Sequence, residues 1–234
     1  DKFRLWRTPG RPNHLTPARI VLVVLVWYAL LALTGTVDRD AQPGLWLLAG
    51  CGAQLLSLVF CLIVARASFR FGLRRGLGLR MNHFLFDTFR GVLGYLAIFP
   101  VCLALHELTF WLLPDNLRGE HFVLEALPGL SPAWRAVAVF SVVVLAPIGE
   151  EVLFRGLIQS SIRRLTASPW TAIAITSVFF AIVHGAYVKD VPAIFALSLA
   201  MGYNYERCGR LYPAILMHFL FNGVFVLSRL LSAS

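Results

Sequence analysis

Long apolar runs separated by short polar connections dominate this chain of 234 residues. Several runs reach the roughly 20 residues that an α-helix needs to cross a bilayer. Seven can be distinguished: Ile20–Val37, Leu45–Ala65, Gly91–Leu113, Trp134–Gly149, Trp170–Tyr187, Val191–Tyr205 and Leu211–Leu231. The fourth and sixth are short for a full span, and we expect the fourth to continue as the helix that carries Glu150 to Arg164. The pattern predicts an all-α, polytopic membrane helix bundle of about seven or eight helices.

Composition supports this prediction. Hydrophobic residues make up 58% of the chain and charged residues 14%, whereas an average soluble domain carries about 25% charged residues. These values exclude a soluble globular protein, and also a disordered chain, which would be poor in apolar residues. The spacing of the four cysteines predicts neither disulfides nor a cysteine-based zinc site. A net charge of +9 also occurs in nucleic-acid-binding proteins, but we attribute it to cytoplasmic loops and expect no nucleic-acid partner.

Basic residues in short loops predict the orientation, because they accumulate on the cytoplasmic side of a membrane. Two stretches hold 11 of the 21 basic residues: the N-terminal segment with Lys2, Arg4, Arg7, Arg11 and Arg19, and the second connection with Arg66, Arg70, Arg74, Arg75, Arg80 and Arg90. The connections Asp38–Gly44 and Pro114–Ser131 are acidic or balanced. We therefore expect a cytoplasmic N-terminus and an external C-terminus. The first span resembles a signal peptide in its flanking charge, but it is long for one and we expect it to be retained.

The stretch Phe69–Phe89 alternates arginine with phenylalanine and leucine. Two interpretations fit this pattern: an amphipathic segment at the membrane surface, or a solvated basic loop.

Polar residues inside the apolar runs are the candidates for function, since ionisable groups are costly in hydrocarbon. The C-terminal half contains Glu150, Glu151, Arg155, His184, Asn204, His218 and Asn222, whereas the N-terminal half contains only His106 and Glu107. This asymmetry predicts that any chemistry lies between residues 147 and 222.

Glu150 and Glu151 are adjacent, so on a helix their side chains point about 100° apart. Arg155 follows Glu151 by four residues and can form an ion pair with it on the same face. Glu150 then remains free to act as a general base. The alternative is a wetted Glu-Glu-Arg cluster that caps a helix at the cytoplasmic end. Pro147, one turn earlier, predicts a kink or an end of the helix beside a cavity.

His184 lies near the end of the fifth run, where an interfacial histidine is the simpler interpretation. His218 and Asn222 are four residues apart on one helix face and can both donate toward one point, although a polar contact between helices also explains them. If the three groups converge, they form a buried active site. Because no serine or cysteine accompanies them, the attacking group is expected to be water, activated by a carboxylate or a metal.

The three groups also resemble known motifs. Glu150-Glu151-Val152-Leu153-Phe154-Arg155 resembles the EExxxR motif of the CAAX-protease and bacteriocin-processing family of intramembrane proteases. Phe180–His184 resembles its FxxxH motif and His218–Asn222 its HxxxN motif, in the family's order. The resemblance covers roughly residues 134–231. We accordingly divide one integrated domain into an N-terminal membrane region with a basic cytoplasmic segment (residues 1–131) and a catalytic helical core (residues 132–234).

The family includes the type II CAAX prenyl endopeptidases. The resemblance implies a conical cavity within the membrane, open toward the cytoplasm, and hydrolysis of peptide bonds in membrane-associated substrates such as a peptide or a lipidated protein C-terminus. It further implies that Glu150 and His184 activate water and that His218 and Asn222 stabilise the oxyanion. Glu151 and Arg155 would hold the site, and Arg155 would be available to a substrate carboxylate.

A zinc ion is the alternative to a metal-free glutamate mechanism. Glu150, His184 and His218 would be its ligands, with water completing a catalytic zinc geometry. We favour the metal-free mechanism and expect no cofactor. We expect a multi-pass protein of the bacterial cytoplasmic membrane. A catalytically silent scaffold of the same fold remains an alternative, but the intact motif residues favour catalysis. A transporter or proton relay would predict an internal repeat, and none is visible.

Overall fold

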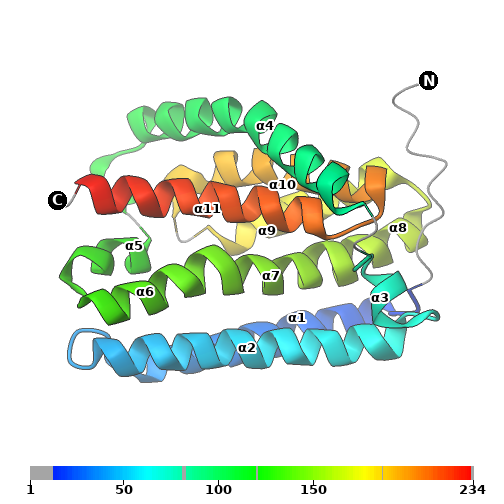
Figure 1. Cartoon of the computed structure of the whole chain (residues 1–234), viewed down its shortest axis with the longest axis horizontal. Helices are drawn as coiled ribbons and strands as arrows, with labels where there is room; N and C mark the ends of the chain where they lie inside the picture. Colours follow the sequence, from blue (N-terminus) through cyan, green and yellow to red (C-terminus); the bar gives the residue numbers. More distant parts are fainter. Residues whose placement is uncertain (1–12, 81–82, 120, 186, 233–234) are drawn as a thin grey trace.

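The computed structural model describes residues 13–80, 83–119, 121–185 and 187–232. They form seven long helical segments and two short helices (Figure 1): α1 (Pro17–Ala32), α2 (Pro43–Ser68), α3 (Gly72–Gly76), α4 (Phe84–Leu112), α5 (Phe122–Ala126), one continuous helix made of α6 (Pro132–Phe140), α7 (Ala146–Glu151) and α8 (Ser160–Thr166), then α9 (Pro169–Val183), α10 (Val191–Cys208) and α11 (Tyr212–Ser232). Within these described ranges there is no β-strand, only one isolated bridge. The predicted all-α bundle is confirmed.

Five of the helical segments are long and apolar enough to cross a membrane: Pro17–Thr36, Pro43–Ser68, Phe84–Leu112, Pro132–Thr166 and Tyr212–Ser232. The chain is therefore a multi-pass membrane protein. The fourth run continues into a helix as expected, but it is the longest span and not a short one. The fifth run stops at Val183 rather than Tyr187. Helices α9 and α10 make a short hairpin, so seven full spans was an overestimate.

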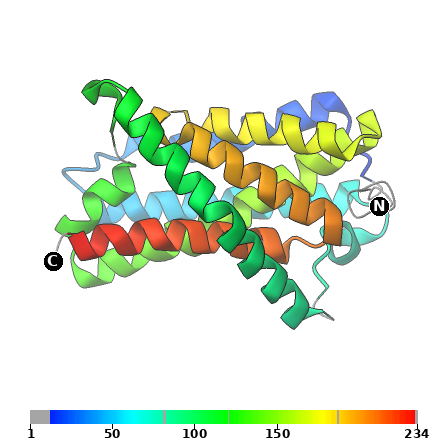
Figure 2. The same cartoon turned by 90° about the horizontal axis from the view of Figure 1, so that it is seen from above.

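The helices lie in layers around the long α6–α8 helix. Helices α1 and α2 pack together on one side of it, and α4 lies against α10 and α11 on the other. Seen from above, α4 crosses these two helices obliquely (Figure 2). It bends near its middle, where Pro100 lies inside the helix and removes a backbone hydrogen bond.

The bundle has two ends of different charge. The end near the N-terminus, which we call the basic end, carries these basic residues: Arg19, Arg66, Arg70, Arg74, Arg75, Arg80, Arg90, Arg163, Arg164, Arg207 and Arg210. The opposite end carries Arg39, Arg118, Arg135, Lys189 and Arg229, together with most of the acidic residues. Successive connections thus lie at alternate ends of the bundle, in the order that the sequence predicts. Lys2, Arg4, Arg7 and Arg11, which also entered that prediction, lie outside the described residues.

The connection between α2 and α4 is neither a plain loop nor wholly a surface segment. Phe69 and Leu77 are buried and α3 lies between them, whereas Phe71 and Leu79 remain exposed. Leu77 packs so closely on the long helix that a Cβ at Gly156 would approach it to 2.6 Å. The apolar side of this arginine-rich segment therefore helps to close the basic end of the bundle, which excludes a fully solvated loop over the described part.

Candidate active site

The long helix that carries Glu150, Glu151 and Arg155 contains two π-helical segments, Ser141–Leu145 and Val152–Gln159. Of the two predicted alternatives at Pro147, a kink or an end of the helix, the end is wrong, because the helix runs through this residue. The irregularity takes the form of wider turns instead, which are frequent at functional sites.

Asn222 supplies the hydrogen bond that Pro147 leaves unmade. In the first π segment Ala146 N–H donates five residues back, to Ser141 O. Pro147 has no N–H to continue this pattern to Val142 O. The side-chain Nδ2 of Asn222, from α11, donates to that carbonyl instead, at 2.9 Å. One N–H of the predicted oxyanion donor is therefore committed to the helix backbone, and the other remains.

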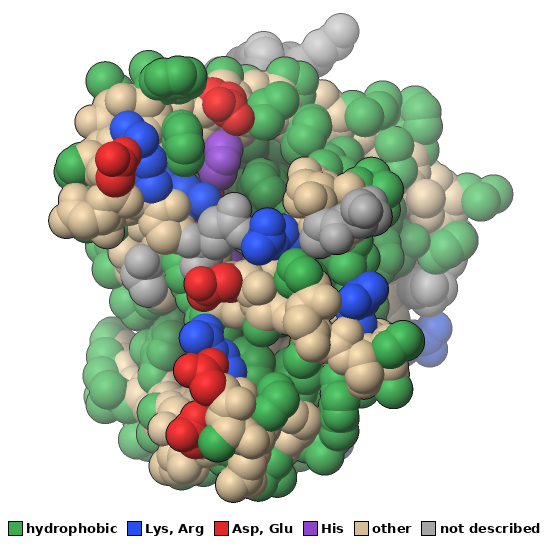
Figure 3. Space-filling model, turned by 90° about the vertical axis from the view of Figure 1, so that its left-hand side faces the viewer, with side chains coloured by type: hydrophobic (Ala, Val, Ile, Leu, Met, Phe, Trp, Pro, Cys, Tyr) green, Lys and Arg blue, Asp and Glu red, His purple; other side chains and the backbone are tan. Residues whose placement is uncertain are grey.

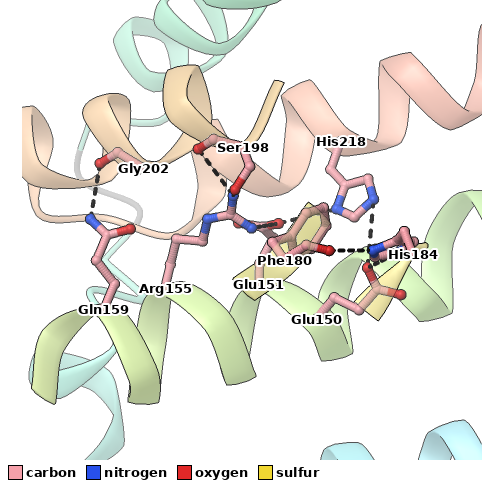
Figure 4. Close-up of polar contacts among 9 residues, drawn as sticks. All are labelled: Glu150, Glu151, Arg155, Gln159, Phe180, His184, Ser198, Gly202 and His218. Atoms are coloured by element: carbon pink, nitrogen blue, oxygen red, sulfur yellow. Dashed lines mark hydrogen bonds and ion pairs between the residues drawn. The ribbon is translucent and has the colours of Figure 1, made fainter. Parts of the chain in front are cut away.

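Glu151 and Arg155 form the ion pair that their spacing predicts. Both side chains are fully buried, and Arg155 Nη1 donates to Glu151 Oε1 at 2.7 Å (Figure 4). Arg155 Nη2 also donates to the hydroxyl and carbonyl oxygens of Ser198 on α10, at 2.7 and 3.2 Å. The guanidinium carbon lies 4.8 Å from the ring centroid of Phe180. Arg155 is therefore enclosed by protein, and the predicted contact with a substrate carboxylate does not fit this arrangement.

The π segment keeps a third polar residue on the same buried stripe. In an α-helix, residues eight apart differ in direction by about 80°, and the wider turns compensate for this drift. Gln159, eight residues after Glu151, is fully buried and donates to Gly202 O at 3.1 Å and to Glu206 Oε1 at 3.0 Å. A polar seam thus joins the long helix to α10 over two turns (Figure 4).

Glu150 faces two histidines on different helices. Its Oε2 lies 3.7 Å from His184 Nε2 and 3.8 Å from His218 Nε2 (Figure 4). This oxygen is buried and has no hydrogen-bond partner among the described residues. A buried carboxylate oxygen without a partner is costly, so the site is built to receive another group at this point.

The second nitrogen of each histidine is held in place. His184 Nδ1 lies 2.7 Å from Phe180 O, and His218 Nδ1 lies 3.1 Å from Glu151 Oε1. A carbonyl oxygen and an ionised carboxylate can only accept hydrogen bonds, so each Nδ1 carries the proton. The Nε2 atoms are then the nitrogens that face Glu150. Such support fixes both the tautomer and the ring orientation.

A cavity of about 310 Å³ adjoins Glu150. The structure brings Glu150, His184, His218 and Asn222 to its wall, while Glu151 and Arg155 lie behind it. The rest of the lining is mostly apolar and comes from α1, α2, α5, α9, α10, α11, the connections next to them and the long helix itself. Asn204, the other polar candidate in this half, donates to Met217 Sδ instead.

Several residues of the site and its surroundings escaped the sequence analysis. Gln159 continues the four-residue spacing after Arg155, which was a usable signal, whereas Ser198 and Gly202 carry none. His106 pairs with Asp190 at 2.7 Å and so ties α4 to the connection that follows His184. Glu107 is exposed.

Gly149 gives Glu150 its position, because a Cβ at this residue would lie 2.8 Å from the ring of the buried Trp27. We expect Gly149→Ala to destabilise the protein by about 1–3 kcal/mol through overpacking and to displace the neighbouring Glu150. Gly52→Ala is the matched control, since nothing lies within 4 Å of its added Cβ. Thermal unfolding of the purified proteins in detergent tests this, and equal midpoints for the two variants would contradict it.

A histidine and a tyrosine meet where the cavity reaches the surface. The rings of His121 and Tyr187 are 4.7 Å apart between centroids, and His121 Nδ1 accepts from Val123 N–H at 3.2 Å. Burial, and then the charge of His184, lower the pKa of His121 to about 4, although Asp190 opposes this. His121 is therefore held neutral at the start of α5.

This pKa predicts acid sensitivity. His121 binds a proton near pH 6.5 in the unfolded protein but only near pH 4 in the folded protein. Protonation of His121 therefore does not change the free energy of unfolding above pH 6.5. The free energy of unfolding should then fall as the pH decreases from 6.5 toward 4. In His121→Asn, which keeps a capping oxygen but does not titrate, this fall should be smaller. Unfolding curves between pH 4 and 7.5 measure it, and equal slopes would refute it.

The donor set suits zinc in part. Two imidazole nitrogens and a carboxylate are common catalytic zinc ligands, and each Nδ1 has the kind of partner that supports a ligating histidine. However, within the described ranges no three His, Cys, Asp or Glu side chains are arranged so that they could hold a metal ion. The choice between a zinc ion and a metal-free mechanism therefore stays a prediction.

Comparison with known proteins connects this site to a family. Residues 132–224 match the family model of the type II CAAX prenyl endopeptidases, described as Rce1-like. The matched segment contains all three motifs, so the resemblance is confirmed there.

Two curated bacterial proteins are also similar to the chain. It is 29% identical over 105 residues to an uncharacterized 24.3 kDa protein of Escherichia coli, covering 44% of this chain and 48% of that protein. It is 33% identical over 85 residues to the uncharacterized protein YpbD of Bacillus subtilis (strain 168), covering 35% and 40%. The chain thus spans less than half the length of each of these relatives. No solved structure matches it.

Proposed function

We propose that this protein is an intramembrane endopeptidase that hydrolyses peptide bonds of membrane-associated polypeptides by means of water activated at Glu150. The observation that carries this proposal is the partnerless Oε2 of Glu150, which lies between the Nε2 atoms of His184 and His218 at the wall of the cavity. The family match supports the class of reaction. The five long apolar helical segments support a location in a membrane, the two relatives support a bacterial one, and the charge of the basic end supports a cytoplasmic N-terminus.

In the proposed reaction a water molecule occupies the space between Glu150 and His184. Glu150 takes one of its protons, and His184 Nε2 accepts a hydrogen bond from the other. The water oxygen bonds to the carbonyl carbon of the substrate, and the carbonyl oxygen becomes the oxyanion. Glu150 then passes its proton to the amide nitrogen as the C–N bond breaks, which releases an amine and a carboxylic acid. The acid loses the remaining water proton to His184 Nε2, which returns it to solvent. One carboxylate serves as base and then as acid.

The remaining polar groups stabilise and orient the reacting ones. His218 keeps Nδ1–H on Glu151, and once its Nε2 has taken up a proton from solvent it presents Nε2–H to the oxyanion. The second N–H of Asn222 is the other candidate donor. Preorganised donors of this kind contribute most where water is excluded. Arg155 acts through Glu151, so it is a positioning residue.

The mostly apolar cavity suits a substrate that enters from the lipid phase as a peptide or a lipidated protein C-terminus. Either a prenyl chain or apolar side chains of the substrate could pack against the apolar cavity wall, because neither needs a buried hydrogen-bond partner. A catalytically silent scaffold that binds a partner protein is the alternative function.

The test compares the purified protein with Glu150→Ala on a panel of prenylated and unlipidated membrane peptides, with and without a chelator. Glu107→Ala is the matched control, since Glu107 is an exposed glutamate outside the site. We expect the unmodified protein and the control to cut at least one peptide, and Glu150→Ala to cut none. Activity lost with chelator and restored by zinc would overturn the metal-free mechanism. A complete lack of cleavage would favour the scaffold.

A further inference from the structure

We infer that the substrate reaches the site from the extracytoplasmic side, so that the bond cut lies in the extracytoplasmic portion of a membrane-anchored polypeptide. This inference rests on the proposed function for the nature of the substrate, but its geometric part stands without it. The resemblance implies a cavity open toward the cytoplasm, and three features of this chain favour the other side.

The first feature is the recessed turn between α9 and α10. These helices have 15 and 18 residues, or about 22 and 27 Å, whereas the α6–α8 helix has 35 residues, or about 52 Å. In Figure 1 the hairpin stops short of the opposite end, which α6 and α11 reach. His184 lies at this turn. The hollow beyond it is the cavity, and its lining extends to Phe122, whose side chain is 39% exposed.

The cavity wall is confined to this half of the bundle. Helix α2 contributes only Trp46 to Gln54, and α10 only Ala193 to Leu197. Helix α1 contributes Leu31 near its end, and Thr34 follows in the short 3-10 turn. No residue of the basic end lines the cavity among those described. The accessible route therefore leads to the opposite end, where acidic, basic and histidine side chains interrupt the apolar surface (Figure 3).

The second feature is the closure of the basic end. Between the site and the basic end, Arg155 and Gln159 are fully buried, and both donate hydrogen bonds to α10. Nearer the basic end, Asn13 is also fully buried, and its Nδ2 donates to the hydroxyls of Ser160 and Ser161 at 2.8 Å each. A substrate that came from the basic end would have to break these buried hydrogen bonds, which is costly in a low-dielectric environment.

The third feature is the charge of the two ends. Within the described residues, the basic end carries eleven Lys and Arg side chains against the acidic Asp87 and Glu206. The opposite end carries five against six acidic residues: Asp38, Asp40, Glu107, Asp115, Glu125 and Asp190. Lys and Arg near the ends of spans determine orientation by remaining in the cytoplasm. The basic end is therefore cytoplasmic, and the cavity opens on the other side.

The outer part of the cavity, which we call the mouth, is lined by His121, Phe122, Tyr187 and Asp190. These residues indicate what kind of polypeptide segment the cavity accepts. Of its charged groups, Asp190 is paired with His106 at 2.7 Å, and His121 is neutral. An aromatic wall of His121, Phe122 and Tyr187, with ring centroids 4.4–6.4 Å apart, lines the way in. Such a passage suits an uncharged, extended stretch of chain next to its membrane anchor, because burying a charged group against aromatic and apolar side chains is costly.

Labelling with a membrane-impermeant thiol reagent tests the access route without requiring cleavage. The parent protein has Cys51 and Cys208 replaced by serine and keeps the buried Cys61 and Cys102. Three single cysteines are then introduced: Thr34→Cys in the cavity wall, Leu117→Cys at the opposite end and Leu79→Cys at the basic end. Leu117 and Leu79 are a matched pair, at 40% and 42% exposure.

We expect Thr34→Cys and Leu117→Cys to react in intact cells, and Leu79→Cys to react only after the membrane is permeabilised. Reaction of Leu79→Cys but not Leu117→Cys in intact cells would overturn the orientation. Labelling of Leu117→Cys without Thr34→Cys would overturn access to the cavity from that side. Any of these results leaves the protease proposal intact, while failure of all cleavage assays leaves the access route intact. Variants are accepted only if they elute as the parent does in gel filtration.

Discussion

Replacing Glu150 by glutamine is expected to lower the rate of peptide cleavage by about 10²–10⁴-fold, the usual contribution of a general base. The amide has nearly the same shape as the carboxylate but cannot take the proton of the attacking water. The Glu150 side chain is 20% exposed and forms no ion pair with an arginine, so the fold should tolerate the change. Cleavage of a membrane peptide by the purified variant measures the effect.

Glu107→Gln is the control, because it removes the same charge from an exposed position of α4. We expect its rate to equal that of the unmodified protein. A Glu150→Gln protein that keeps more than about a tenth of the activity would be inconsistent with a general base at this position.

Replacing Arg155 by methionine is expected to have the largest effect on stability. It leaves the carboxylate of Glu151 buried without its ion-pair partner, and breaking a buried pair from one side costs about 3–5 kcal/mol. His218 offsets only part of this loss through its single hydrogen bond to Glu151. The free energy of unfolding in mixed detergent micelles measures the effect. Arg39→Met, which removes a partly exposed arginine, should change it by less than about 1 kcal/mol.

A second variant distinguishes loss of the ion pair from loss of packing. In the double variant Glu151→Gln with Arg155→Met no buried charge is left alone, so stability should recover in part. Activity should not recover, because His218 then loses the carboxylate that orients it. Equal stability of the single and double variants would argue against an uncompensated charge as the cause.

The apolar pattern predicted the helices well but the spans less well. All seven runs correspond to helical segments, because a long apolar run in a membrane protein has few alternatives to a helix. The sixth run, which forms α10, was expected to be short for a span, but the early end of α9 at Val183 could not be predicted, because it depends on the turn in which His184 sits. That the helix continues through Pro147 could not be predicted for a similar reason. The missing hydrogen bond is restored by Asn222, 75 positions later in the chain, and a local rule for proline cannot include such a partner.

The candidate site shows the same division between local and distant contacts. The Glu151–Arg155 pair follows from four-residue spacing on one helix, and Glu150 remains apart from it, as that spacing predicts. The roles of Ser198 and Gly202 depend on which face of α10 meets the long helix, and nothing in the sequence of α10 marks that face. The mouth residue His121 lies in a connection, where apolar periodicity gives no information.

Hydrolysis in H₂¹⁸O, followed by mass spectrometry, tests most directly whether water activated by Glu150 is the attacking group. The protein would be incubated with a membrane peptide that it cuts, and both the products and the intact protein would be weighed during turnover. We predict one ¹⁸O atom in the new carboxylate, no covalent adduct on the protein, and no product from Glu150→Gln. An acyl adduct on the protein, or labelled product from Glu150→Gln at the unmodified rate, would contradict this account.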